Sequence, residues 1–234
     1  MLTVLWSPKG GVGVSVVAAA LAVAMAEARS SVDRSQVDRP SSGAERDMLL
    51  VDPCGDQPSV LGLARPSGPG LRDWAATPDR DPAALGRLTV PVVEGLRLLP
   101  AGDGPPLGRT AAQELVAALA GSAEDVVVDV GAVRRCGAVD PLAPLVEAAD
   151  HSLMVVRPCY LALRAGVAAE ARPDGVVVVE EPGRALVSRD VADVLAAPVM
   201  ATVPLDPAVA RAVDAGVLAR RLPRVLAHAF KDLV

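Results

Sequence analysis

An apolar stretch, a glycine-rich turn and a second apolar stretch open this sequence, in that order. Residues 2–6 have the composition of a buried strand, residues 16–25 that of a helix, and the turn between them reads Lys9-Gly10-Gly11-Val12-Gly13-Val14-Ser15. A turn of this kind directs backbone N–H groups and the positive end of a helix dipole toward one point, where an anion binds. The sequence therefore predicts a phosphate-binding loop. However, Val14 stands where the Walker pattern G-x-x-x-x-G-K-[ST] requires a lysine.

Apolar runs and helical patterns alternate along the rest of the chain. The expected strands cover residues 48–52, 126–131, 152–156, 175–179 and 199–204, and the expected helices cover 110–120, 162–170 and 188–196. This alternation predicts an α/β fold with a doubly wound, mostly parallel sheet. With 234 residues, we expect one domain spanning residues 1–234.

Two segments interrupt or follow this pattern. Residues 27–47 are polar and lack apolar periodicity, which predicts a flexible insertion; a solvated loop without a role is its simplest interpretation. Residues 222–234 have the pattern of an amphipathic helix, with an apolar stripe opposite Arg220, Arg224 and Lys231. Such a helix either packs on its own domain, which we favour, or lies on an anionic membrane.

Charge and cysteine content exclude several classes of protein. A net charge of −5 argues against a chain that coats nucleic acid over a broad face. Cys54, Cys136 and Cys159 show no C-x-x-C spacing, so neither a zinc site nor a disulfide framework is indicated. No apolar run reaches the roughly 18 residues that a membrane span needs. We expect a cytoplasmic protein, with peripheral membrane contact as the alternative.

The glycine loop resembles K-G-G-x-G-K-[ST], the deviant Walker A motif of the MinD/ParA family of P-loop ATPases in the SIMIBI class. Lys9, Gly10, Gly11, Gly13 and Ser15 match this motif. The resemblance implies a P-loop NTPase fold that binds ATP or ADP with Mg²⁺ through the loop from Gly10 to Ser15, including the backbone of Val12 and Val14. It also implies a homodimer in which Lys9 reaches the phosphates of the partner subunit.

The same resemblance assigns the acids at two strand ends. Asp129 matches the Walker B-like acid that holds Mg²⁺ together with Ser15, directly or through water. Asp52 is a weaker candidate for catalysis, because the family pattern D-x-D-P-x-G meets Asp52-Pro53-Cys54-Gly55 here, one acid short. Either Asp52 is the first acid and Cys54 replaces the second, or Asp52 is the second in a shifted register.

The segment Pro204-Leu205-Asp206 resembles the turn that lies against the base in this family. Relatives often carry a base-reading asparagine after the preceding strand, whereas Glu180 follows Val179 here. An acid still accepts a proton from an exocyclic amino group. The identity of the base is therefore open.

The missing lysine lowers the expected activity. Loss of a charged donor to phosphate costs about 1.5 to 3 kcal/mol, or roughly ten- to a hundred-fold in affinity, and hydrolysis is expected to be slow or absent. The resemblance implies dimerisation and protein partners in chromosome partition, septum placement or pilus and secretion assembly, the last including TadZ/CpaE-like proteins with altered loops. The alternatives are an active ATPase switch that uses Lys9 and an ATP-dependent small-molecule synthetase on the same fold.

Overall fold

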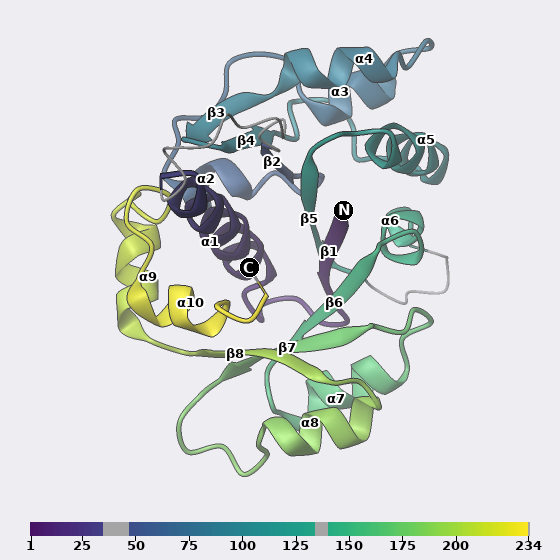
Figure 1. Ribbon diagram of the computed structural model, residues 1–234. Coiled ribbons are helices and arrows are strands. Elements are labelled where there is room, and N and C mark those ends of the chain that lie inside the picture. Colours follow the sequence, from purple (N-terminus) through teal and green to yellow (C-terminus); the bar gives the residue numbers. More distant parts are fainter. Residues whose placement is uncertain (35–46, 134–139, 234) are drawn as a thin grey trace.

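The computed structural model describes residues 1–34, 47–133 and 140–233, and its centre is an eight-stranded sheet (Figure 1). The spatial order is β3-β4-β2-β5-β1-β6-β7-β8, and only the edge strand β3 runs antiparallel to its neighbour. The strands are β1 (Leu2–Ser7), β2 (Met48–Val51), β3 (Val90–Val93), β4 (Leu96–Leu99), β5 (Asp125–Ala132), β6 (His151–Val156), β7 (Gly175–Glu180) and β8 (Val199–Pro204). The prediction of a doubly wound, mostly parallel sheet is confirmed.

Helices cover both faces of the sheet and make a three-layer arrangement (Figure 1). One face carries α1 (Val14–Arg34), α2 (Gln57–Leu61), α9 (Pro207–Asp214) and α10 (Arg224–Ala229). The other carries α3 (Leu71–Ala76), α4 (Pro82–Leu85), the 3₁₀ turn η1 (Gly86–Leu88), α5 (Arg109–Ala120), α6 (Ala143–Glu147), α7 (Tyr160–Val167) and α8 (Ser188–Leu195). Each face has its own apolar core, since side chains alternate between the two sides of every strand.

The first strand and helix lie at the centre of the molecule. All six residues of β1 are buried, and the indole nitrogen of Trp6 donates to the Ser152 hydroxyl at 2.9 Å, which satisfies its one polar group. Residues 17–26 of α1 are buried all round, between the sheet on one side and α2 and α10 on the other. A helix that is apolar on every side requires such a place. The glycine loop is thereby held between two buried elements.

Two predicted boundaries differ from the structure. Residues 27–34 continue α1, so the predicted insertion at 27–47 does not begin at residue 27. The helix continues there because alanine, arginine and glutamate have high helix propensity. Residues 35–46 lie outside the described part of the chain. The helix predicted over 222–234 is shorter, because Pro223 precedes α10 and turns follow it.

The C-terminal segment packs on its own domain. Leu226 and Phe230 are fully buried, and α10 contacts α1 and β8. Its apolar stripe is therefore used within the protein, as favoured from the sequence. Among the described residues, no helix has the length and apolar character that crossing a bilayer requires.

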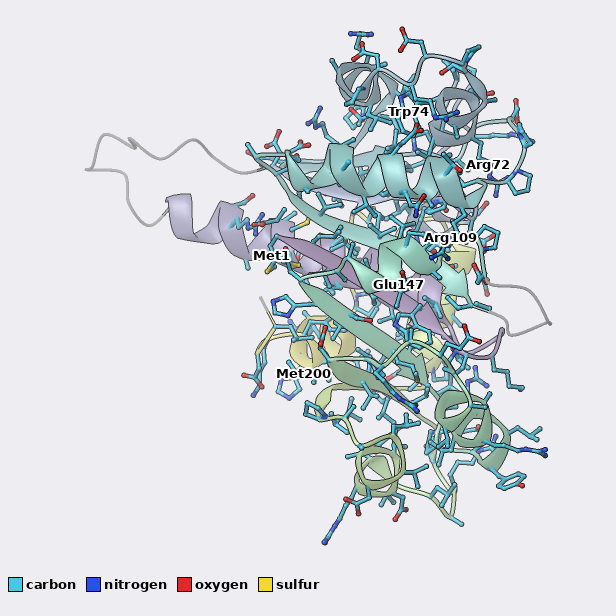
Figure 2. The ribbon with its side chains drawn as sticks, turned by 90° about the vertical axis from the view of Figure 1, so that its right-hand side faces the viewer. Met1, Arg72, Trp74, Arg109, Glu147 and Met200 are labelled. Atoms are coloured by element: carbon cyan, nitrogen blue, oxygen red, sulfur yellow. The ribbon has the colours of Figure 1, made fainter. Side chains whose placement is uncertain are left out.

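The amino ends and the carboxyl ends of the parallel strands lie at opposite sides of the molecule (Figure 2). Met1 and Met200 mark the amino ends of β1 and β8, and Arg72 lies at the opposite side of the molecule. On the face toward the viewer, Arg109 of α5 and Glu147 of α6 form an ion pair at 3.7 Å. In open α/β sheets ligands bind outside the carboxyl ends of the strands. The predicted site residues follow a strand or, like Asp129 of β5 and Pro204 of β8, lie in its carboxyl-terminal half, and so they belong to the carboxyl ends of the strands.

Candidate functional site

The glycine loop after β1 has open space beside its two left-handed glycines. Gly11 and Gly13 have φ values of 79° and 95°, and no atom lies within 4 Å of the position that a Cβ would take at either residue. Left-handed backbone of this kind is strained for any other residue, so the glycines permit the turn. The first helical bond of α1 runs from the Val17 amide to the Gly13 carbonyl at 3.0 Å. Among the hydrogen bonds of the described residues, none uses the amides of Gly11, Gly13 or Val14.

Side chains of the loop divide between the core and solvent. Val12 and Val14 are 4% and 6% exposed and belong to the apolar core on the α1 face, whereas Lys9 is exposed. Ser7 fixes the start of the loop, because its hydroxyl donates to the Lys9 carbonyl at 2.9 Å. Val14 therefore supplies no cation to the loop, and its side chain lies in the core.

Asp129 lies beside the loop, at the register position of Leu5 on β1. Its carboxylate is fully buried and accepts hydrogen bonds from the Gln57 side-chain amide at 2.8 Å and the Gly131 amide at 3.1 Å. Burial raises the pKa of Asp129 to about 6, while hydrogen bonds from the Ser15 hydroxyl and Gln57 act in the opposite direction. Three groups of this chain thus hold the acid, and none of these partners is a cation.

Asp52 follows β2, next to β5 in the sheet, and is also fully buried. Its two oxygens accept from the backbone amides of Gly55 at 2.6 Å and Gln57 at 3.0 Å. Burial raises the pKa of this carboxyl, and the same two amides oppose that change. Asp52 organises the turn that follows it. Its predicted catalytic role stays a prediction.

Cys54 does not replace a carboxylate. Its thiol lies 3.2 Å from the carbonyl oxygen of Val130, to which it donates. Burial, and then the charge of Asp129, raise the pKa of this thiol to about 12. A neutral S–H group neither orients water as an acid does nor acts as a nucleophile at neutral pH. Cys54 therefore adds no charge next to Asp129.

Two residues of the site were not predicted from the sequence. Gln57 bonds to both acids, and the Arg72 guanidinium donates to the carbonyl oxygens of Pro53 at 2.8 Å and Cys54 at 2.7 Å. A signal for Gln57 existed: Asp56 followed by Pro58 is typical of the start of a helix, here α2, directly after a strand-end acid. Arg72 comes from a segment that reads as irregular and offers no comparable signal.

The base-side turn begins where β8 ends. Asp206 caps α9, since its carboxylate accepts from the Ala208 amide at 2.7 Å, and Leu205 is 45% exposed. The Leu205 amide donates to the Glu180 carbonyl at 2.6 Å, which joins the turn to the end of β7. The turn lies at the same edge of the sheet as the glycine loop. Its predicted contact with a base remains a prediction.

The two predicted magnesium ligands differ in what they offer. Asp129 has no exposed oxygen, and its hydrogen-bond partners are donors of this chain. Mg²⁺ in proteins is usually bound by one or two carboxylates and several waters at octahedral positions. The observed contacts do not fit a direct bond from Asp129 to that ion. Ser15 is half-buried and its hydroxyl oxygen still has free lone pairs.

Solved structures resemble this chain over its whole length, while no family model and no curated protein sequence matches it. The septum site-determining protein MinD of Pyrococcus horikoshii OT3, complexed with Mg-ADP, aligns with a TM-score of 0.74 and 19% identity, covering 100% of this chain and 94% of that chain. A ParA family ATPase from Chlorobium tepidum TLS aligns with a TM-score of 0.70 and 20% identity, covering 99% and 96%. The chain has the MinD/ParA fold.

A third match comes from the MinC:MinD cell division protein complex of Aquifex aeolicus, with a TM-score of 0.73, 20% identity and coverage of 100% and 95%. Identities this low carry the fold and leave the chemistry to the residues of this chain. The predicted P-loop NTPase fold is thus confirmed.

Proposed function

We propose that this protein binds ADP or ATP weakly at the loop from Gly10 to Ser15 and acts through dimerisation and protein partners, with hydrolysis slow or absent. The observation that carries the proposal is the loop itself: no atom lies within 4 Å of the Cβ positions of Gly11 and Gly13, and the amides of Gly11, Gly13 and Val14 have no acceptor among the described residues. Helix α1, 21 residues long, begins directly behind it and adds its dipole to the free amides.

The loop binds phosphate through the backbone alone. Its amides and the end of α1 supply partial positive charge, whereas the Val14 side chain is turned into the core. Lys9 is exposed, and the hydrogen bonds and ion pairs of the described residues do not occupy its ammonium group. In a dimer, the Lys9 ammonium group of one copy would lie next to the phosphates of the nucleotide bound to the other copy. Nucleotide affinity should therefore be low and should rise on dimerisation.

Slow hydrolysis follows from the acids. Phosphoryl transfer depends on charges placed around the transferred group. Val14 provides none, Cys54 is a neutral thiol, and the carboxylates of Asp52 and Asp129 are buried among donors of this chain. The same arrangement suits a protein whose nucleotide state controls assembly more than turnover.

The fold supports a role in spatial organisation of the cell. The solved structures that it resembles include a septum site-determining protein, a ParA family ATPase and a MinC:MinD complex. We propose that residues 1–234 act as one P-loop NTPase-like domain in chromosome partition, septum placement or pilus and secretion assembly. Pro204–Asp206 would contact the base.

Isothermal titration calorimetry with ADP tests the binding site, using wild type, Val14→Lys and Val14→Met. The lysine adds a phosphate donor, and the methionine controls for side-chain length and for disturbance of the buried position. We expect Val14→Lys to bind roughly ten- to a hundred-fold more tightly than wild type, and Val14→Met to match wild type. Absence of binding in all three proteins would remove the nucleotide function.

Phosphate release tests the catalytic part. Purified protein with ATP and MgCl₂ should release phosphate more slowly than about one turnover per minute. Faster steady turnover that disappears in Lys9→Ala would show an active ATPase that uses this lysine. That result would contradict the proposal of slow or absent hydrolysis and leave nucleotide binding intact.

A further inference from the structure

Gln57 lies between the loop helix and the acids. Its side-chain nitrogen is 2.8 Å from Asp129 Oδ2 and 3.0 Å from the carbonyl oxygen of Ser15, in the first turn of α1. An amide nitrogen carries two hydrogens, so each oxygen receives one of them. The backbone amide of the same residue donates to Asp52 Oδ2 at 3.0 Å. One residue therefore bonds to both acids and to the helix behind the loop.

The chemistry of the neighbours fixes which way this amide points. In the reverse orientation the amide oxygen would face a carboxylate oxygen and a carbonyl oxygen, and oxygen acceptors repel one another. As observed, Oε1 of the fully buried Gln57 has no partner among the described residues. This acceptor is unsatisfied because the amide is oriented with its nitrogen toward the two oxygens. Donation from the nitrogen is therefore the determining interaction of the side chain.

The nitrogen sits where a cation would be attracted. A carboxylate oxygen, a carbonyl oxygen and the nearby Ser15 hydroxyl are the hard oxygen ligands that divalent ions prefer. The amide supplies partial positive charge at that point, but it is neutral and held covalently. With the amide in place, Asp129 has no oxygen turned toward open space. This explains why Asp129 does not fit a direct bond to Mg²⁺.

We propose that the Gln57 side-chain amide occupies the cation position beside Asp129, so that the nucleotide site of this chain works without a divalent ion. The proposal deepens the proposed function and rests on it for the nucleotide, but the closed cation position can be tested without one. Gln57 is a positioning residue here: it holds Asp129 against α1 and contacts no phosphate.

The first experiment measures thermal unfolding of nucleotide-free wild type, Gln57→Glu and Gln57→Met, each with EDTA or with about 5 mM MnCl₂ or CaCl₂. Gln57→Glu keeps the shape and turns the donor into a third carboxylate, which makes a site for a divalent ion. We expect the melting temperature of Gln57→Glu to rise by about 5 °C or more with the metal. Wild type and the uncharged control Gln57→Met should stay within about 1 °C.

Two outcomes of this experiment would overturn the proposal. Wild type stabilised by the metal as much as Gln57→Glu would mean that the position is open. A folded Gln57→Glu that shows no response would mean that the amide does not stand at a cation position. If Gln57→Glu does not fold in EDTA, its recovery on adding MnCl₂ supports the proposal, and failure to recover contradicts it.

The second experiment uses wild type only. The affinity for ADP, measured by calorimetry in EDTA and in MgCl₂, should agree within about three-fold. A gain of about ten-fold or more with Mg²⁺ would overturn the proposal. Absence of ADP binding under both conditions would instead overturn the proposed function, and the thermal experiment would still decide the role of Gln57.

Discussion

The glycine loop after β1 and the acid cluster formed by Asp52 after β2 and Asp129 within β5 lie side by side, and they are built in opposite ways. The loop consists of backbone: no atom lies within 4 Å of the Cβ positions of Gly11 and Gly13, and the amides of Gly11, Gly13 and Val14 have no acceptor among the described residues. The acid cluster consists of side chains that satisfy one another, with Asp52 and Asp129 fully buried. The loop half of the site offers amides without acceptors, and the acid half is closed by its own hydrogen bonds.

The two parts of a nucleotide site depend on side-chain identity to different degrees. An anion cradle survives the loss of a lysine because backbone amides and a helix dipole do not depend on side-chain identity. A metal site depends on each ligand, so one amide such as Gln57 is enough to occupy it.

Gly62 tests how tightly the closed half is packed. It ends α2 at φ 75°, and a Cβ there would lie 2.0 Å from the carbonyl oxygen of Gly216, which is backbone and cannot move aside. Gly62→Ala should lower the free energy of unfolding by roughly 4 kcal/mol, from overpacking and left-handed strain together. Chemical denaturation measures this loss.

Gly183→Ala is the matched control. Gly183 has φ 82° and no atom within 4 Å of its Cβ position, so only the strain of about 1 to 2 kcal/mol applies. Equal losses in the two variants would mean that the close approach of α2 to Gly216 does not hold the cluster in place.

The buried acid makes stability depend on pH. Because the pKa of Asp129 is raised to about 6 in the folded protein, the folded state binds this proton more tightly than the unfolded state. Stability from this group is complete below the unfolded value of 3.8 and is lost as pH rises through 6. Relative to Asp129→Asn, wild type should lose at most about 3 kcal/mol between about pH 4 and pH 7.

Asp125 provides a control of opposite sign. Burial would raise its pKa, but hydrogen bonding and attraction from the N-terminal ammonium and Arg29 outweigh burial and lower it. The stability that Asp125 contributes is therefore lost as pH falls. Denaturant titrations of wild type, Asp129→Asn and Asp125→Asn, extended down to about pH 2, should give difference curves of opposite slope, with the Asp125 curve changing below the unfolded pKa of 3.8. A flat curve for Asp129→Asn would show that this acid is solvated.

Arg72 connects the cluster to α3. Its half-buried guanidinium makes charge-assisted hydrogen bonds to the carbonyls of Pro53 and Cys54, in the turn that follows Asp52. Arg72→Met keeps the stem and removes the donors, and should cost about 2 kcal/mol of unfolding free energy. The control Arg65→Met removes an exposed pair with Asp103 and should cost less than about 1 kcal/mol. Similar costs would mean that Arg72 only packs.

The open half was predictable from the sequence, and the closed half only in part. Glycines that need positive φ identify a turn by residue type, so Gly11 and Gly13 were found without coordinates. Asp129 was found because it ends a run of valines in a parallel sheet. Contacts between side chains depend on register and helix direction. Gln57 reaches Asp129 across 72 positions of sequence, and Arg72 reaches Cys54 across 18.

Val14 illustrates the same limit at one position. The sequence gives its identity and thereby the loss of a charge, but not whether the side chain fills the loop or joins the core. Its 6% exposure and its place in the α1 core decide that question. The direction of a side chain at the first turn of a helix follows from what the helix packs against.

Lys9 gives the smallest effect on stability and separates the open half from the folded core. Its side chain is exposed, so Lys9→Gln should change the free energy of unfolding by less than about 0.5 kcal/mol. The proposed role across the dimer nevertheless predicts that Lys9→Gln weakens ATP-dependent dimerisation, measured by light scattering with and without ATP. A wild-type dimer that forms equally in both conditions, or a Lys9→Gln dimer of unchanged affinity, would contradict that role. Since the substitution leaves the backbone amides in place, any remaining monomeric ADP binding would come from the loop itself.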